Sequence, residues 1–266
     1  MTRHSNGTYV YGVIAGGRRR DTGRRGALDA VVPNRVRGLP GTGAVRVLDL
    51  DRNLFAAVAD APLRVYGETA LARKLSDLEW VSRAAVSHEA VLESFVDAMA
   101  IVPMKLFTLF TSDDRALAHL RAERHRIEAT VKRVANQQEW GVRVVLDRPP
   151  AARRRVAAVV PASGMSYLKE KKVQRDLTTE LAARAGETVD ELFHRLTARA
   201  TVSKRRPASE LSAGTGRLLL DAAFLVPRSR AKAFGSAVAR EARTLGRAGY
   251  AVTMNGPWPP YSFVQD

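Results

Sequence analysis

The sequence predicts an α+β protein of two domains, and three observations indicate this class. Strand-like and helix-like patterns alternate irregularly along the 266 residues, a length that suits two domains of about 100–200 residues each. The composition, with 45% hydrophobic and 26% charged residues, is typical of a globular protein with a sizeable core. A stretch rich in proline and arginine, residues 148–162, then interrupts the pattern and is expected to link the domains.

The first domain is expected over residues 1–147 and begins with a strand at residues 8–14. This strand is apolar at both alternating positions, as in a central strand that is covered on both faces. One face is expected to carry Tyr9, Tyr11 and Val13, and the other Val10 and Ile14. A loop insert rich in Gly, Arg and Pro follows at residues 15–44. Two strand-like runs, 44–50 and 54–59, then predict a hairpin.

Two helices and two further strands complete the predicted first domain. The first helix is expected to begin at a capping box, Ser76 to Glu79, and to end before Pro103. Its inward stripe is predicted from residues at helical spacing: Leu78, Ala85, His88, Leu92, Phe95 and Met99. A strand is predicted over residues 103–110, a helix that begins at Ser112, and a last strand over residues 141–147.

The second domain is expected over residues 163–266. Helices are predicted over residues 163–185, with Gly186 just past the end, and from a second capping box at Thr188 to Ala200. The remaining predicted elements are strands at 201–204 and 218–226, a helix at 229–247 and a strand at 250–255. This order predicts a small sheet packed on helices.

The formal net charge of +16 favours acidic partners, and nucleic acid is one of them. The densest basic clusters are Arg18–Arg20 with Arg24 and Arg25, Arg153–Arg155, and Lys204–Arg206, all expected in loops. No aromatic residues are interleaved with them as stacking platforms for bases. We therefore favour solvated loops, and keep as the alternative a basic nucleic-acid-binding module that uses these Arg-rich loops.

The sequence contains no recognisable catalytic or metal-binding constellation. It has no cysteine, which excludes disulfides, thiolate metal sites and a cysteine nucleophile. The five histidines lack ligand spacing, and His88 is expected to be a hydrogen-bonded core residue. Ser166 and Lys169 match Ser-x-x-Lys without its companion motifs, and residues 38–43 resemble a phosphate loop only in glycine content. We expect no enzymatic activity, no cofactor and no metal.

Neither a membrane span nor a secretory signal is expected. The longest apolar runs are far shorter than the roughly 20 residues that cross a bilayer. The N-terminus lacks a basic stretch followed by an uninterrupted apolar segment. These observations predict a soluble, cytoplasmic protein.

The segment 256–264, Gly-Pro-Trp-Pro-Pro-Tyr-Ser-Phe-Val, is the most distinctive of the chain. Its prolines and aromatic residues are Pro257, Trp258, Pro259, Pro260, Tyr261 and Phe263. Proline restricts the backbone, which predicts an extended segment that loses little conformational entropy when it docks. Because aromatic side chains are costly to leave in water, this tail is expected to bury against its own domain. Docking on a partner is the alternative.

This tail and the opening Tyr9–Val13 resemble the gas vesicle protein GvpL/GvpF family. Four internal segments extend the resemblance over nearly the whole chain: Leu54–Ala59, His88–Leu92, Val102–Thr108, and Gly164-x-x-Tyr-Leu168. The glycine that is usual in the family is absent from Leu106-Phe107-Thr108. This departure and the insert 15–44 suggest a divergent paralogue.

The resemblance implies a non-enzymatic accessory protein that helps to build gas vesicles. Its implied partners are the apolar shell subunit and other accessory proteins, with no specific nucleic acid and no membrane, and its implied location is the gas vesicle. The implied fold has a C-terminal modified ferredoxin-like domain with additional helices. The signature residues, for protein binding or for structure, are Tyr9, Tyr11, His88, Pro103, Tyr167 and the six tail residues.

Overall fold

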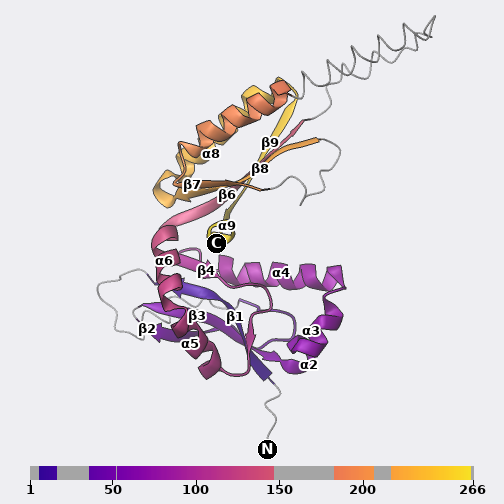
Figure 1. The fold of residues 1–266 in the computed structure, drawn as a ribbon, viewed down its shortest axis with the longest axis vertical. Helices are drawn as coiled ribbons and strands as arrows, with labels where there is room; N and C mark the ends of the chain where they lie inside the picture. Colours follow the sequence, from indigo (N-terminus) through magenta and orange to yellow (C-terminus); the bar gives the residue numbers. More distant parts are fainter. Residues whose placement is uncertain (1–5, 17–35, 52, 147–182, 207–216, 265–266) are drawn as a thin grey trace, which may run out of the picture. The chain divides into compact units, whose positions relative to one another are not determined.

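The computed structural model describes residues 6–16, 36–51, 53–146, 183–206 and 217–264. The chain divides into two compact units (Figure 1), of which the first comprises Met1–Gln138 with Trp258–Asp266, and the second Glu139–Pro257. Each unit contains a β-sheet and helices, which confirms the α+β class. The expected linker 148–162, Tyr167 and most of the insert 15–44 lie outside the described residues.

The first sheet is built around β1 and has the strand order β2-β3-β1-β4, with β5 also paired to β1. Its strands are β1 (Asn6–Ala15), β2 (Arg46–Asp51), β3 (Leu54–Pro62), β4 (Ala100–Pro103) and β5 (Leu109–Phe110). β1 is antiparallel to β3, β4 and β5, and it is buried from Gly7 to Ala15. The prediction of a central strand covered on both faces is therefore confirmed.

A β-bulge at Tyr11 changes which residues of β1 share a face. Val10 pairs with Val58 of β3 and Gly12 pairs with Ala57, which leaves Tyr11 as the extra residue. One extra residue reverses the alternation of side chains beyond it. Ile14 consequently joins Tyr9 and Tyr11 in one core cluster, and the expected assignment of Ile14 to the opposite face is wrong.

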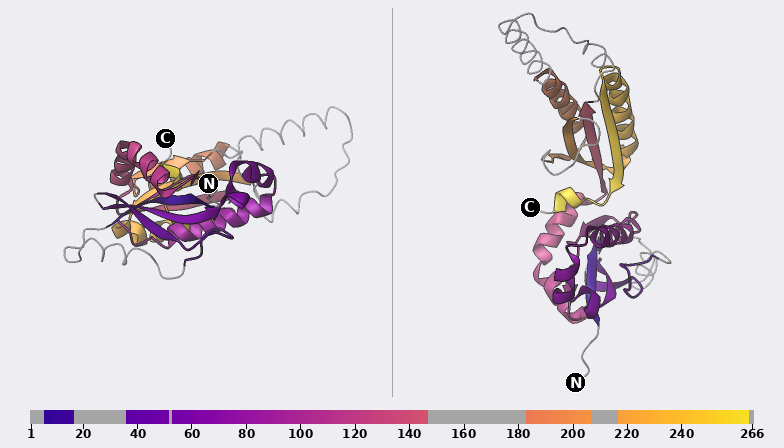
Figure 2. Two further views of the ribbon diagram at one scale, coloured as in Figure 1. Left: turned by 90° about the horizontal axis from the view of Figure 1, so that it is seen from below. Right: turned by 90° about the vertical axis from the view of Figure 1, so that its right-hand side faces the viewer.

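Helices cover both faces of this sheet. They are α2 (Leu63–Tyr66), α3 (Glu68–Lys74), α4 (Leu78–Glu93), α5 (Asp113–Ala122) and α6 (Arg124–Val134). The buried residues of α4 are Ala84, His88, Val91 and Leu92. Three of them, Ala84, Val91 and Leu92, belong to the core cluster that contains Tyr9 and Tyr11. α5 contacts β1 and β2, and α6 contacts β4. The right-hand view of Figure 2 shows α5 and α6, in pink, beside the first sheet.

The start and the inward face of α4 differ from expectation. The N-cap is Asp77, whose carboxylate accepts a hydrogen bond from the backbone N–H of Trp80 at 3.0 Å, rather than Ser76. Leu78 is 78% exposed and Ala85 is also exposed, so their assignment to the inward stripe is wrong. His88, Leu92 and Phe95 are buried as predicted. The helix buries the row that faces the tyrosines of β1, a choice that periodicity alone does not identify.

The second unit has the arrangement of a ferredoxin-like fold. Its elements are β6 (Gln137–Leu146), a helix at residues 183–197, β7 (Val202–Arg205), β8 (Arg217–Pro227), the 3-10 turn η3 (Arg228–Arg230), α8 (Ala231–Gly246) and β9 (Tyr250–Trp258). The sheet order is β7-β8-β6-β9. Strand, helix, strand, strand, helix, strand with this order is the ferredoxin-like topology, as the resemblance implies.

Within the described residues of the second unit, the helix 183–197 and α8 pack on the same face of the sheet. Their side chains form one core cluster with alternate residues of β6 and β8, which include Val142, Val144, Phe224 and Val226. Figure 1 shows α8 lying along this sheet. The helices contribute Val189, Leu192, Leu196, Phe234, Val238 and Leu245 to the cluster.

Two details of the second unit differ from the sequence-based expectation. β6 was expected to close the first domain, but it pairs between β8 and β9 in the second sheet. The helix at 183–197 continues through Gly186, and the hydroxyl of Thr188 donates to the carbonyl of Arg184 one turn back instead of capping a new helix. Both differences arise because tertiary packing overrides a local signal.

The first prediction concerns the close approach of β1 and β4. A methyl group at Gly12 would lie 2.8 Å from the Val102 carbonyl oxygen and 2.9 Å from Cδ2 of Leu92. We expect Gly12→Ala to lower the free energy of unfolding by about 2 kcal/mol, measured by urea unfolding. The matched control is Gly186→Ala, because nothing lies within 4 Å of that position. Equal stability of the two variants would contradict the crowding at Gly12.

Candidate functional site

Three of the signature residues meet in the interior of the first unit. Tyr9 and Tyr11 are 0% exposed and His88 is 4% exposed. The rings of Tyr9 and Tyr11 lie 4.8 Å apart between centroids, and that of His88 lies 5.8 Å from Tyr9 and 5.5 Å from Tyr11. Tyr66 of α2 joins them, 6.4 Å from Tyr9. Pro103 is buried at the end of β4, where it pairs with Gly12 of β1.

Tyr9 links two segments through its hydroxyl. The Tyr9 hydroxyl accepts the backbone N–H of Phe107 at 3.1 Å and lies 2.8 Å from Nδ1 of His88, within hydrogen-bond distance. A hydroxyl can donate one proton and accept through two lone pairs, so the direction of the second bond follows the tautomer of His88. Tyr9 thereby connects α4 to the turn at Phe107.

Burial shifts the titration of the whole cluster. It lowers the pKa of His88 to about 4, against the opposing effect of the nearby Met104 backbone. It raises the pKa of Tyr66 to about 12, and the pKa values of Tyr9 and Tyr11 above the ordinary tyrosine range. All four side chains are accordingly neutral near pH 7, which is the state that a buried hydrogen-bonded cluster requires.

The glycine-rich stretch 38–43 binds the tyrosines of this cluster. The backbone N–H of Leu39 donates to the Tyr11 hydroxyl at 3.0 Å, and the Tyr66 hydroxyl donates to the Pro40 carbonyl at 2.8 Å. A side chain at Gly38 would collide with the Tyr11 hydroxyl, 2.3 Å from the position of a Cβ. The resemblance to a phosphate loop thus has a structural explanation, because these backbone groups are used by tyrosine side chains.

Phe107 stands where the resemblance leads us to expect a glycine, and its backbone has φ = 67°. This left-handed conformation costs a non-glycine residue of the order of 1 kcal/mol. The surroundings hold it there: its N–H is bound by Tyr9, and its ring stacks on Trp80 with centroids 5.2 Å apart and planes 9° apart. The expected strand 103–110 is therefore largely wrong: of its residues, Pro103 ends β4 (Ala100–Pro103) and Leu109–Phe110 form β5, and residues 104–108 are not strand.

The aromatic tail packs within the first unit. Phe263 is 2% exposed, Pro259 and Pro260 are buried, and Tyr261 packs against the tyrosine cluster. The chain is extended to Trp258 and then forms α9 (Tyr261–Val264), which contacts β4. The tail therefore docks intramolecularly, but on the first unit, whereas we expected the C-terminal domain. A fully extended form is also wrong, because proline is compatible with the residues that begin a helix. Pro257 is exposed.

The outward side of α4 is the surface that the sequence analysis missed. Among the described residues, the exposed large hydrophobic side chains are Leu75, Leu78, Val86 and Val96, all on this helix or beside its ends. Acidic residues accompany them, and burial together with the charge of Glu93 raises the pKa of Glu89. Only Val86 gave a sequence signal, because at helical spacing it lies about 160° around the axis from His88, whereas Leu78 lies only about 40° from Leu92.

Two residues of the basic cluster Lys204–Arg206 are engaged within the second unit. Arg205 lies 2.7 Å from Asp190 and its guanidinium lies 4.4 Å from the ring centre of Phe193. Arg206 pairs with Glu139 at 2.9 Å and with Asp221 at 3.5 Å, and both carboxylates are buried. Buried carboxylates need such partners. The other two basic clusters lie outside the described residues.

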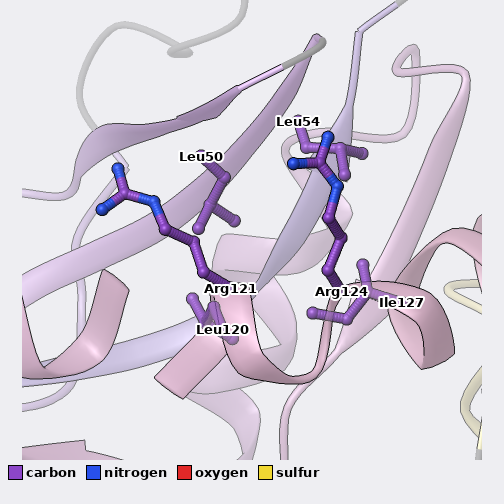
Figure 3. Close-up of a pocket in the computed structure, with 6 residues that line it drawn as sticks. All are labelled: Leu50, Leu54, Leu120, Arg121, Arg124 and Ile127. Atoms are coloured by element: carbon purple, nitrogen blue, oxygen red, sulfur yellow. The ribbon is translucent and has the colours of Figure 1, made fainter. Parts of the chain in front are cut away.

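A small apolar depression lies between the β2–β3 hairpin and the helices α5 and α6 (Figure 3). It is lined by Leu50, Leu54, Leu120, Arg121, Arg124 and Ile127. In Figure 3 Leu50 lies between the two arginine side chains. Arg124 forms ion pairs with Glu128 at 2.9 Å and with Asp51 at 3.6 Å, and these carboxylates balance its positive charge. The lining offers no nucleophile and no acid–base pair.

The described part of the chain offers neither a cluster of metal ligands nor a membrane-spanning helix. No group of three or more histidine and carboxylate side chains is placed to hold a metal ion in that part. Within the same residues, no helix combines the length and the apolarity that a membrane span requires. Ser166 and Lys169 are not among the described residues.

Comparisons with known proteins give a consistent result along the chain. The model of the family described as gas vesicle synthesis protein GvpL/GvpF matches residues 7–265. Gas vesicle protein L of Streptomyces sp. (strain CB03234) is 30% identical over 243 residues, which cover 89% of this chain and 88% of that protein. Gas vesicle protein F of the same strain is 29% identical over 221 residues, covering 77% and 88%.

The crystal structure of the gas vesicle protein GvpF from Anabaena sp. PCC7120 superposes with a TM-score of 0.66 at 16% identity, covering 98% of this chain and 97% of that chain. GvpF from Microcystis aeruginosa gives a TM-score of 0.64 at 15% identity, covering 98% and 99%. The fold is therefore that of the gas vesicle proteins called GvpF. Because the family model also spans residues 7–265, the chain belongs to the GvpL/GvpF family. Membership implies a role in gas vesicle assembly and association with gas vesicles.

The second prediction follows from the low pKa of His88. Between about pH 6.5 and pH 4, His88 is protonated in the unfolded chain but stays neutral in the folded protein. Stability is thus complete above about pH 6.5 and falls by up to about 3 kcal/mol as the pH drops to 4. We expect His88→Asn, whose uncharged amide can still hydrogen-bond to the Tyr9 hydroxyl, to lose less stability across this window. Urea unfolding at several pH values measures the difference, and exposed His194→Asn is the control. An unchanged pH profile in His88→Asn would contradict this account.

The third prediction concerns the tail. We expect Phe263→Ala to lower the free energy of unfolding by about 3 kcal/mol, because it removes a buried ring. The control is Val264→Ala, whose side chain is only half-buried, and which should cost about 1 kcal/mol. Urea unfolding compares the two variants, and an equal, small effect in both would argue against docking of the tail.

Proposed function

We propose that this protein is a non-enzymatic accessory protein that binds the apolar shell subunit of the gas vesicle, and other accessory proteins, during nucleation or growth. The observation that carries this proposal is membership of the GvpL/GvpF family across residues 7–265. The accessory role is what the resemblance to that family implies. The buried signature residues and the exposed hydrophobic side chains at α4 suit a binding protein better than an enzyme.

The shell's chemistry explains why such a protein is needed. A subunit with large apolar faces and open strand edges aggregates unless these surfaces are covered before assembly. The cover must also be released, which favours a modest and reversible interface over a permanent one. An accessory protein for this task needs exposed aliphatic side chains on a rigid support, and α4 presents them on the first sheet.

The signature aromatic residues support this role indirectly. Tyr9, Tyr11, His88 and Phe263 are buried, so their contribution is to hold the first unit together. We infer that partners bind elsewhere on the surface. The net charge of +16 would accelerate the encounter with acidic partners, and this contribution weakens with added salt.

Co-expression with the shell subunit tests the proposal. We expect the subunit to co-purify with the tagged protein and to shift from the insoluble to the soluble fraction, because its apolar faces are covered. The control is the shell subunit expressed alone. The absence of co-purification, of crosslinks and of any change in solubility would refute direct binding.

Titration with heparin and with duplex DNA tests the alternative. Several phosphate contacts would give a steep log–log dependence of affinity on salt, whereas incidental charge gives weak retention. Turnover of a small molecule by the purified protein would contradict the non-enzymatic role.

A further inference from the structure

The exposed hydrophobic side chains of this protein are concentrated on one helix. Single exposed apolar residues are normal on protein surfaces, but a cluster indicates an interaction site. Leu78 is 78% exposed and Val86 66%, and Leu75 and Val96 continue the patch at 50% and 39%. Among the described residues no other exposed large hydrophobic side chain is found. We call these four residues and the α4 surface between them the α4 patch.

The α4 patch is presented on a rigid support. A neighbouring side of the helix buries Ala84, His88 and Leu92, which fixes the rotation of the helix about its axis. The helix therefore cannot turn to bury Val86, which lies about 160° around the axis from His88, without exposing His88. The patch is a stable feature of the folded unit.

The charge around the α4 patch is opposite to that of the whole protein. The chain carries a net charge of +16, yet residues 73–97 contain five carboxylates, those of Asp77, Glu79, Glu89, Glu93 and Asp97, against three cations, Arg73, Lys74 and Arg83. Lys74 lies over the ring of Trp80. Arg83 forms an ion pair with Glu79. Glu89, Glu93 and Asp97 have no ion-pair partner in the part of the chain that the structure describes. At helical spacing Glu89 and Glu93 fall between Leu78 and Val86 around the axis. Both are half-buried and Asp97 is exposed, so a cationic partner can reach all three.

We propose that the α4 patch docks an amphipathic segment of the shell subunit in which aliphatic side chains are flanked by lysine or arginine. This inference rests on the proposed function and specifies its surface. The aliphatic side chains would pack on Leu78 and Val86, and the cations would meet Glu89, Glu93 and Asp97. Nucleic acid does not fit this surface, because its phosphates would face carboxylates.

Two pairs of variants test the apolar and the acidic parts of the α4 patch separately. Leu78→Gln with Val86→Gln removes the apolar contact, and Glu89→Lys with Glu93→Lys reverses the charge. We expect each pair to weaken binding of the shell subunit about tenfold or more, measured by titration of the co-purified, tagged proteins. The weakening by charge reversal should diminish at high salt.

Matched controls separate the α4 patch from general effects. Leu78→Met preserves the apolar surface and should bind like wild type. Glu187→Lys with Glu191→Lys makes the same charge change, also four residues apart on a helix, at exposed positions of the second unit and should leave binding within about twofold. Because the substituted side chains are exposed or half-buried, each variant should melt within about 4 °C of wild type.

Site-specific photo-crosslinking identifies the occupant. A photoreactive residue at position 78 or 86 should crosslink to the shell subunit, and one at Lys132 on α6 should not. Crosslinks from 78 and 86 to a second copy, to this chain's own second unit or to another accessory protein would overturn the inference. So would full-strength binding by both variant pairs, and the proposed function would then stand with a different surface. If wild type itself failed to bind the shell subunit, the proposed function and this inference would both fall.

Discussion

The first unit depends on the need to satisfy three tyrosine hydroxyls and a histidine in an apolar interior. Buried polar groups are hydrogen-bonded in nearly all folded proteins, because an unsatisfied one costs about 1–3 kcal/mol. Strand alternation places Tyr9 and Tyr11 on one face, and the bulge in β1 adds Ile14 to it. The tyrosine hydroxyls then need partners from other segments. The stretch 38–43, the turn at Phe107 and helix α4 supply them. Segments distant in sequence are thereby held to β1 by polar contacts of defined geometry.

This arrangement separates the residues that identify the family from those that face solvent. The signature tyrosines and His88 point inward, and by doing so they set which side of α4 points outward. The acidic and apolar α4 patch is thus a consequence of interior packing. Its charge differs from that of the chain as a whole, and only a local view of the surface reveals it.

Much of the fold could be predicted from the sequence, because hydrophobic patterns identify strands and helices well. The central strand β1, the Ser112 cap of α5 and the strand–helix–strand end of the second unit follow from such patterns. The bulge at Tyr11 could not be predicted, because it depends on pairing with β3. The membership of β6 in the second sheet depends on strands that lie far along the chain. Of the site, His88 was recognised as a core residue, but the α4 patch was missed because Leu78 was assigned to the buried side.

Because of the tail, the first unit can be completed only after the second unit has been synthesised. Because residues Trp258–Asp266 belong with the first unit, the ferredoxin-like unit is in effect inserted into the one that precedes it. During translation the ribosome makes nearly all of the first unit early, but Phe263 and α9 emerge only after the whole second unit. The first hydrophobic core is closed last. A fragment cut after β6 therefore lacks part of its own interior, and it exposes to solvent the apolar surface that Phe263 and α9 cover in the whole chain.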